Sequence, residues 1–514
     1  MARPVCHGMV LQLPISLLSI GLALALSPLS INAQILDSQA ALNTALEQIS
    51  GERMRADVTS LSKSFNGRQA GTDDDLTSAQ WVGDRFLKFG LRMPTIRNYP
   101  LTIPSLVGKD GTSSGLMATF ITTSRIDPDP SLRISAGGDA PSRRLGAEYL
   151  PVFDSPSAGV QGPIVFVGYG IADQANGLND YDGVDVHNCV VLFLRGKPDY
   201  YQPPISHADK VRIATQKGAI GYLTATGPVL NAYEARRGIT GTPSAFYGMT
   251  DALPGAWIST ALAEEILADP PQTGQLRTRQ EQLNKAPISQ ALRTGRFGSL
   301  SWNTKPIEGL LTNVLASIPG SDAYMGQDAV VIGAHRDHFG IQAGLVFPGA
   351  DDNASGTAVM LEVARILAMQ PVHSKRTILF ISFSGEERGL LGSRLYVGRP
   401  VVSLDSTKAM INIDHASIGN GRLTVGVTGL EKSLAQEAGQ LAGLADKLDL
   451  FGFFPGGDHV PFKEAGVPTV TVVSGGVHPH FHQPTDTAET VSAEILTSTA
   501  RYVLALAWQL ANAP

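Results

Sequence analysis

The pattern of hydrophobic and polar residues changes twice along the 514-residue chain. Residues 38–91 carry apolar side chains at helical spacing, and Gly67 and Gly71 divide this segment into separate helices. Residues 101–303 instead hold short β-prone runs between turn residues, which predicts a β-rich middle region. Its clearest runs are GPIVFVGYG (162–170), CVVLFLRG (189–196) and GAIGYLTAT (218–226).

From residue 313 onward, apolar runs are separated by helical segments. These runs lack alternating polar residues, as strands do when helices cover both faces of a parallel sheet. Residues 354–369 and 433–442 carry helix-spaced apolar side chains between them. The C-terminal half is therefore predicted to be α/β, with a mostly parallel central sheet sandwiched by helices. The runs are AVVIGA (329–334), TILFISF (377–383), AMINI (409–413) and PTVTVV (468–473).

The first 33 residues have a composition of their own. Arg3 is their only charged residue, residues 15–26 are strongly apolar, and Ala33 offers a small residue for cleavage. This pattern is typical of a secretory signal peptide, because its apolar part is too short to span a membrane. A retained signal anchor is the alternative. We therefore expect an exported protein, periplasmic or extracellular, without a membrane anchor after cleavage.

Composition and charge narrow the functional classes. The hydrophobic fraction of 43% and the charged fraction of 17% are typical of a globular protein. The net charge is −6 and would become about −7 if cleavage removed Arg3, so nucleic acid is not an expected partner. Cys6 lies in the predicted signal peptide, which leaves Cys189 as the only thiol and excludes an intrachain disulfide.

Ionisable residues follow each of the four apolar runs. Because ligands bind at the carboxyl ends of strands in open α/β sheets, we expect these residues to meet in one crevice. A fifth group, in PGADDNASG, places Asp351 and Asp352 before a helix expected to begin near Asn353. Capping of that helix is the alternative for both acids. The residues after the runs are His335, Arg336, Asp337, His338, Glu386, Glu387, Asp414, His415, His478, His480 and His482.

Two histidines and three carboxylates, one of them bridging, suit a pair of divalent ions with an open position for water. A single ion would leave carboxylates in excess. Neighbouring residues at a strand end point in different directions, so one of Glu386 and Glu387 can bind metal while the other is the general base. A solvated acidic turn is the alternative for this pair. Asp337 can accept the second ring N–H of His335.

These residues resemble those of the co-catalytic zinc aminopeptidase family, which includes bacterial leucyl aminopeptidases, aminopeptidase Y and glutamate carboxypeptidases. His335-Arg336-Asp337, GADDNASG, SGEERGLLGS, INID and FHQPTDT occur in that family's order between residues 313 and 490. The resemblance implies His335 and Asp414 on one zinc ion, Glu387 and His482 on the other, and Asp352 between them. It also implies Glu386 as general base and Asp337 as support for His335. His478 and His480 are then pocket-rim residues or solvated loop residues.

The middle region resembles a protease-associated domain inserted into a metallopeptidase, through GPIVFVGYG, VVLFLRG and the segment 210–226. The resulting division is a signal peptide at 1–33, an N-terminal part of the peptidase domain at 34–125, the inserted domain at 126–299 and the catalytic domain at 300–514.

The resemblance implies a di-zinc metallo-aminopeptidase acting on peptides, with Co²⁺ or Mn²⁺ as possible substitutes for Zn²⁺. A carboxypeptidase, or another peptide or amide hydrolase on the same site, is the first alternative. A receptor-like relative without catalysis and a one-zinc glutaminyl cyclase relative are disfavoured, because the full ligand set is present. The sequence departs from the family at Gly457, where many members carry Ser, and at Phe453-Phe454, where some carry Tyr. The oligomeric state is left open.

Overall fold

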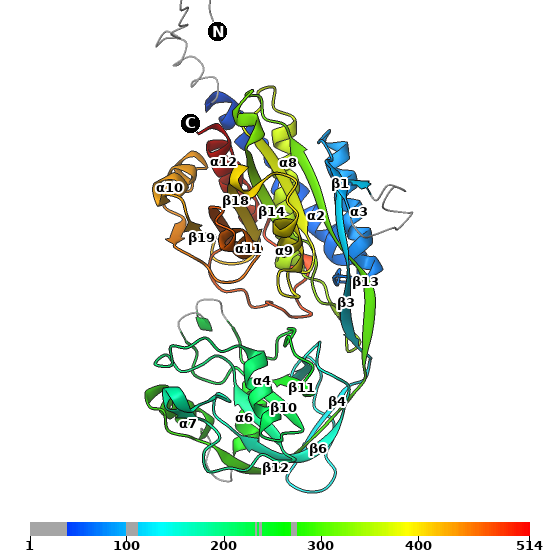
Figure 1. Ribbon diagram of the computed structural model, residues 1–514, viewed down its shortest axis with the longest axis vertical. Helices are drawn as coiled ribbons and strands as arrows, with labels where there is room; N and C mark the ends of the chain where they lie inside the picture. The colour runs from blue at the N-terminus through cyan, green and yellow to red at the C-terminus, as the bar shows by residue number, and fades with distance from the viewer. Residues whose placement is uncertain (1–38, 99–111, 232–233, 236–238, 269–274, 514) are drawn as a thin grey trace, which may run out of the picture.

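Two separate sheets organise the chain in this computed structural model (Figure 1). The structure describes residues 39–98, 112–231, 234–235, 239–268 and 275–513. The signal peptide predicted at 1–33 lies outside these residues. We call the unit around the first sheet the upper body and the unit around the second sheet, residues 131–302, the lower body, as they stand in Figure 1.

The upper body is built on an eight-stranded sheet. Its strands are β3 (Leu116–Ile126), β13 (Thr304–Ile318), β14 (Ala329–His335), β17 (Thr377–Phe383), β18 (Thr407–Asp414), β19 (Leu423–Thr428), β20 (Leu448–Phe451) and β21 (Thr469–Ser474). They are ordered β20-β19-β21-β18-β14-β17-β13-β3, and the central strands β21, β18, β14 and β17 are parallel. The four predicted apolar runs are these central strands, so the predicted α/β class with a mostly parallel sheet is confirmed.

Helices cover both faces of this sheet. They are α2 (Gly51–Ser64), α3 (Asp73–Lys88), α8 (Gly356–Ala368), α9 (Leu391–Gly398), α10 (Lys432–Leu441), α11 (His459–Glu464) and α12 (Ala493–Asn512). Alternate residues of β14 face opposite layers: Val330 and Ile332 pack with α2, α3, α8, α10 and α12, and Val331 packs with α9 and α11.

Local sequence signals explain where these helices begin. The side chains of Ser50 and Thr72 cap α2 and α3 by accepting backbone N–H groups of Arg53 and Asp75. The helix predicted to begin near Asn353 begins instead at Gly356, after an irregular turn over Ala350–Ser355 in which Asp352 and Asn353 have non-helical backbone angles. Among the described residues, none of the helices combines the length and the apolar character needed to cross a membrane.

The lower body has its own seven-stranded sheet. The strands are β4 (Ser131–Ser135), β5 (Tyr149–Pro151), β6 (Ala158–Phe166), β9 (Val190–Leu194), β10 (Gly221–Ala225), β11 (Gly255–Ile258) and β12 (Leu292–Trp302), in the order β4-β12-β6-β9-β10-β11-β5. Its helices are α4 (His207–Gln216), α6 (Thr260–Leu267) and α7 (Gln275–Lys285). The region is thus less purely β than expected, and β12 passes the predicted boundary at residue 299. Its identity as a protease-associated domain stays a prediction.

Two long strands join the bodies. β3 and β13 pair antiparallel from Ile126 and Thr304 up to Leu116 and Val314, and they carry the chain into and out of the lower body (Figure 1). Two-stranded pairs complete the described structure: β1 (Thr95–Arg97) with β2 (Thr112–Ser114), β7 (Ala172–Asp173) with β8 (Leu178–Asn179), and β15 (Gly340–Gln342) with β16 (Leu345–Phe347). Short 3₁₀ helices lie at 174–176, 325–327, 404–406 and 488–490.

Candidate metal centre

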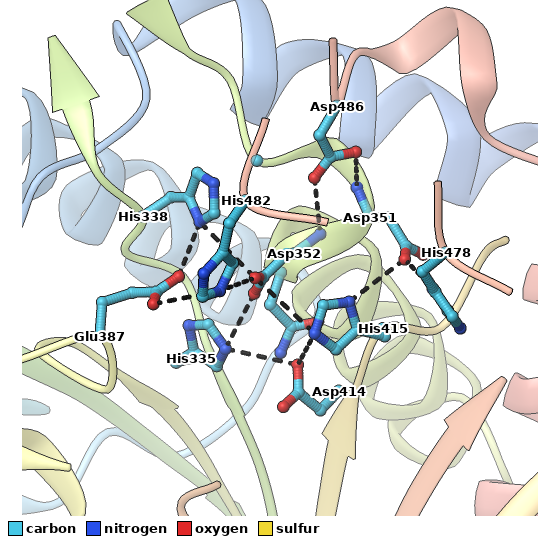
Figure 2. Close-up of polar contacts among 12 residues, drawn as sticks. His335, His338, Asp351, Asp352, Glu387, Asp414, His415, His478, His482 and Asp486 are labelled. Atoms are coloured by element: carbon cyan, nitrogen blue, oxygen red, sulfur yellow. Dashed lines mark hydrogen bonds and ion pairs between the residues drawn. The ribbon is translucent and has the colours of Figure 1, made fainter. Parts of the chain in front are cut away.

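The sheet topology brings the predicted strand-end residues together. His335 is the last residue of β14, Asp414 is the last residue of β18, and Glu387 follows β17. Because β14 lies between β17 and β18, these three side chains leave the sheet at neighbouring positions. Asp352 reaches the same place from the irregular turn before α8, and His482 reaches it from the loop after β21 (Figure 2).

Asp352 lies at the middle of this group. Its Oδ1 atom is 3.5 Å from Nε2 of His335, and the same nitrogen is 3.4 Å from Oδ1 of Asp414. Its Oδ2 atom faces the other way and lies 3.0 Å from Nε2 of His482, which is 3.6 Å from Oε2 of Glu387. The Asp352 carboxylate thus faces two groups of candidate metal ligands. One group is His335 and Asp414, and the other is Glu387 and His482 (Figure 2).

The residues present fit divalent metal ions. Buried imidazole nitrogens and carboxylate oxygens are the ligands that zinc prefers, and two ligand atoms bound tetrahedrally at about 2.0–2.1 Å lie about 3.3 Å apart. The separations around His335 match this value and exceed an ordinary hydrogen-bond length. His335, Asp352 and Asp414 form one candidate ion-binding group, and Asp352 and Glu387 form a second with His338.

His335 is oriented by Asp337, although not by the atom expected. The Nδ1 atom of His335 donates to the backbone carbonyl of Asp337 at 3.1 Å, whereas the Asp337 carboxylate lies 3.6 Å away. That carboxylate accepts the backbone N–H of Glu386 at 3.3 Å. Asp337 therefore fixes the His335 tautomer through its main chain and the start of the Glu386-Glu387 turn through its side chain.

The buried carboxyl groups of the candidate metal centre would be stabilised by a bound cation. Burial raises the pKa of Glu386 and Glu387 well above the usual range of a glutamate, and the nearby carboxylates of Asp414 and Asp352 raise it further. Burial likewise raises the pKa of Asp458 to about 7. A cation bound among these carboxylates would lower their pKa and relieve the repulsion.

Two buried arginines lie near the site, but their donors are already bound. Arg68 donates to the carbonyl groups of Leu61, Arg336, Pro348 and Gly349. Arg336 donates to the carbonyl groups of Thr312, Ser382 and Phe383 and forms an ion pair with Asp75 at 2.9 Å. Both guanidinium groups therefore hold the loops that carry the candidate ligands.

A cavity of about 370 Å³ is lined in part by His415, the residue that follows Asp414 in the sequence. Its walls include Phe451, Phe453 and Phe454, and its floor includes the polar side chains of His415 and His478. Such a cavity has the volume of a small ligand or a single amino acid side chain.

Comparison with known proteins agrees with this geometry. Residues 313–507 match the family model described as Peptidase family M28. The C-terminal part of the chain is thus similar to M28 peptidases. This part spans His335, Asp352, Glu387, Asp414 and His482, so every predicted ligand lies inside the matched region.

Relatives of the matched region carry exopeptidase names. Aminopeptidase YwaD of Bacillus subtilis (strain 168) is 33% identical over 194 residues, which cover 35% of this chain and 41% of that protein. The probable glutamate carboxypeptidase AMP1 of Arabidopsis thaliana is 28% identical over 387 residues, 68% of this chain and 50% of that protein. The chain thus spans about half the length of the curated relatives it matches.

A solved structure extends the likeness to the whole fold. The aminopeptidase from Aneurinibacillus sp. strain AM-1 superposes with a TM-score of 0.63 at 21% identity, covering 92% of this chain and 96% of that one. The lower body is therefore part of the shared architecture.

Several partners within the matched region were not assigned from the sequence. Burial lowers the pKa of His338 well below its usual range, and its neutral ring donates from Nδ1 to Oε1 of Glu387 at 2.7 Å. Asp486 accepts the backbone N–H groups of Asp351 and Asp352 at 2.8 and 3.0 Å (Figure 2). The only sequence feature that pointed to His338 was its place among the ionisable residues that follow β14.

Two alternative interpretations can now be decided. Asp351 and Asp352 do not cap α8, because Asn353 provides the side-chain acceptor for the Gly356 N–H. Asp351 instead accepts from Nδ1 of His478 at 2.7 Å and lies 3.3 Å from Nδ1 of His415.

His478 is buried and lines the cavity, so it is not a solvated loop residue. His480 bonds Thr485 within its own loop. Both residues of the Glu386-Glu387 pair are only partly exposed, so the pair is not a fully solvated acidic turn.

Proposed function

We propose that the protein is an exported zinc-dependent aminopeptidase with two ions per chain. His335 and Asp414 would hold one ion, Glu387 and His482 the other, and Asp352 both. The observation that carries this proposal is the placement of the two Asp352 oxygens, one toward each pair. Zinc suits the mixed nitrogen and oxygen ligands, with Co²⁺ and Mn²⁺ as substitutes.

When bound, the ions would polarise the scissile carbonyl group and acidify a water molecule. Glu386 is the general base: its carboxylate takes a proton from the attacking water and passes it to the nitrogen of the leaving amine. Asp337 keeps the His335 tautomer with Nε2 free to bind metal. His338 holds one oxygen of Glu387 and leaves the other facing His482. These contacts keep the ligands in place before a substrate arrives.

The charge around the site favours a free amino terminus over a carboxyl terminus. A carboxypeptidase would need cationic donors for the substrate carboxylate, and Arg68 and Arg336 already bind backbone carbonyl groups. The cavity lined by His415, His478 and Phe451 then takes the side chain of the N-terminal residue. The naming of YwaD as an aminopeptidase supports this choice.

The test combines metal analysis with a substrate panel. Purified protein is expected to contain two zinc ions per chain and to hydrolyse amino acid 4-nitroanilides, but not the same substrates with a blocked amino group. Preferential cleavage of peptides with a C-terminal glutamate would favour the carboxypeptidase instead. Fewer than one zinc ion per chain without hydrolysis would point to a non-catalytic relative. Accumulation of the processed chain outside the cytoplasm of an expressing cell tests the predicted export.

A further inference from the structure

One loop of the lower body contacts the proposed metal centre directly. Residues 243–249, here called the clamp loop, run beside the loop that carries His482. The N–H of Ala245 donates to the carbonyl oxygen of His482 at 3.0 Å. The side chain of Gln483 donates to the carbonyl oxygen of Pro243 at 2.8 Å and lies 3.1 Å from Oγ of Ser244. Main chain and side chain thus join the two loops.

The clamp loop also orients the His482 ring. Nδ1 of His482 lies 2.8 Å from the carbonyl oxygen of Ala245. A carbonyl oxygen can only accept a hydrogen bond, so Nδ1 carries the proton. The Nε2 atom then keeps a free electron pair, which points toward Asp352 and Glu387. A main-chain group 237 residues away in sequence therefore fixes the tautomer of a proposed ligand.

A second contact ties the clamp loop to the neighbourhood of Glu387. The guanidinium group of Arg388 lies 4.5 Å above the ring of Tyr247. The clamp loop is in turn held by Asp154, whose carboxylate accepts the N–H groups of Gly248 and Met249 at 2.6 and 2.7 Å. The lower body thus supports the segments that carry both Glu387 and His482.

The other pair of proposed ligands receives no such contact among the interactions described for it. His335 is oriented by Asp337 and belongs to β14, which lies between β17 and β18. Asp414 belongs to β18 itself. We propose that the clamp loop is a positioning element for one of the two metal positions, and that the lower body thereby sets the affinity of the Glu387–His482 position selectively. This inference rests on the proposed function.

The test measures zinc retention by the full chain. Gln483→Glu replaces the side-chain donor by an acceptor of the same shape opposite the Pro243 carbonyl. Thr485→Val is the matched control, because it removes a hydrogen bond within the same loop that does not involve the lower body. Each protein is dialysed against a series of chelator concentrations, and the zinc content per chain and the melting temperature are measured.

Wild-type protein is expected to lose its zinc in two steps. Gln483→Glu should shift only the first step, from two ions to one, to a chelator concentration lower by about 10- to 100-fold, as is typical when a group that orients a ligand is lost. Thr485→Val should follow the wild type. Equal shifts of both steps, or no shift at all, in a folded Gln483→Glu protein would overturn the inference.

Ser244→Ala provides a milder version if Gln483→Glu does not fold. It removes one acceptor of the Gln483 amide, and it should shift the first step by about 2- to 10-fold. An unchanged first step in Ser244→Ala would then contradict the inference. A wild-type chain that retains no zinc would overturn the proposed function, and the clamp with it, whereas normal two-step loss by all variants would overturn the clamp alone.

Discussion

The two sheets of this molecule share an architecture but differ at their strand ends. Both place parallel strands at the centre and strands that run antiparallel to these toward the edges. In the upper body, β14, β17 and β18 lead into His335, Glu386-Glu387 and Asp414. In the lower body, β9 and β10 lead into Arg195-Gly196 and Thr226-Gly227. The layered fold alone therefore does not make a metal site, and the residues after the strands do.

Buried charge shows the same contrast. The lower body buries Lys210, whose ammonium group donates to the carbonyl oxygens of Leu194 at 3.0 Å and of Gly196. The rings of Tyr169 and Phe193 lie 5.6 and 5.7 Å from its Nζ atom. Its hydrogen bonds are made by the protein itself, whereas the carboxylates of the upper body face one another. A buried cluster of like charges without protein partners indicates a bound ligand. A buried charge whose hydrogen bonds the protein itself supplies indicates a structural role.

The largest expected effect lies at Glu386. Glu386→Gln keeps the size of the side chain but cannot take up a proton, so kcat should fall by roughly 1,000-fold, within the usual range for a lost general base. Zinc content, measured by atomic emission, should stay at the wild-type value. Glu431→Gln, on the exposed residue before α10, serves as control. Near-normal turnover of Glu386→Gln in zinc-replete buffer would place the base elsewhere.

A smaller loss should separate the histidines of the loop after β21. His482→Ala removes a proposed ligand, so one zinc ion per chain should be lost and activity should decrease at least about 100-fold. His480→Ala should retain both ions, because His480 contacts Thr485. Metal analysis after gel filtration distinguishes the two variants. If they lose metal equally, the loop as a whole and not His482 determines metal binding.

The smallest effect is expected in the lower body. Burial lowers the pKa of Lys210 to about 7, so between that value and the ordinary pKa near 10.4 the folded state binds this proton less tightly than the unfolded chain. The local free energy of unfolding should therefore decrease as the pH falls from about 10 to 7, by an amount on the order of a few kcal/mol.

Lys210→Met should abolish this slope without changing peptide hydrolysis. Hydrogen exchange of the β9 and β10 amides at several pH values measures the local free energy. A variant that lost activity while remaining folded would break the contrast drawn between the two bodies, because it would give the balanced charge of the lower body a catalytic role.

The sequence predicted the central strands and the gathering of five candidate ligands, because both depend on local patterns. Continuous apolar runs marked β14, β17, β18 and β21, and the polar residues that follow them lie near one another once the strands are adjacent. The start of α8 was predicted a few residues too early, since the irregular turn at Ala350–Ser355 has no simple sequence signal.

Contacts between segments that are distant in the sequence could not be predicted from local sequence patterns. The roles of His338 and Asp486 depend on which side chain faces which backbone group, and both partners come from other elements. The bond between His482 and the Ala245 carbonyl depends on how the lower body stands against the upper one. Such contacts follow from three-dimensional packing and leave no periodicity in the chain.

The path of the chain through β3 and β13 also bears on synthesis. All seven strands of the lower sheet come from residues 131–302, whereas the upper sheet needs β3 before that stretch and β13 to β21 after it. A nascent chain that has emerged as far as Trp302 holds every strand of the lower sheet but only β3 of the upper one. Folding of the lower body brings the end of β3 beside the point where β13 begins. β13 follows next in the chain and pairs with β3 along its length, which protects that edge of β3 from pairing with other chains.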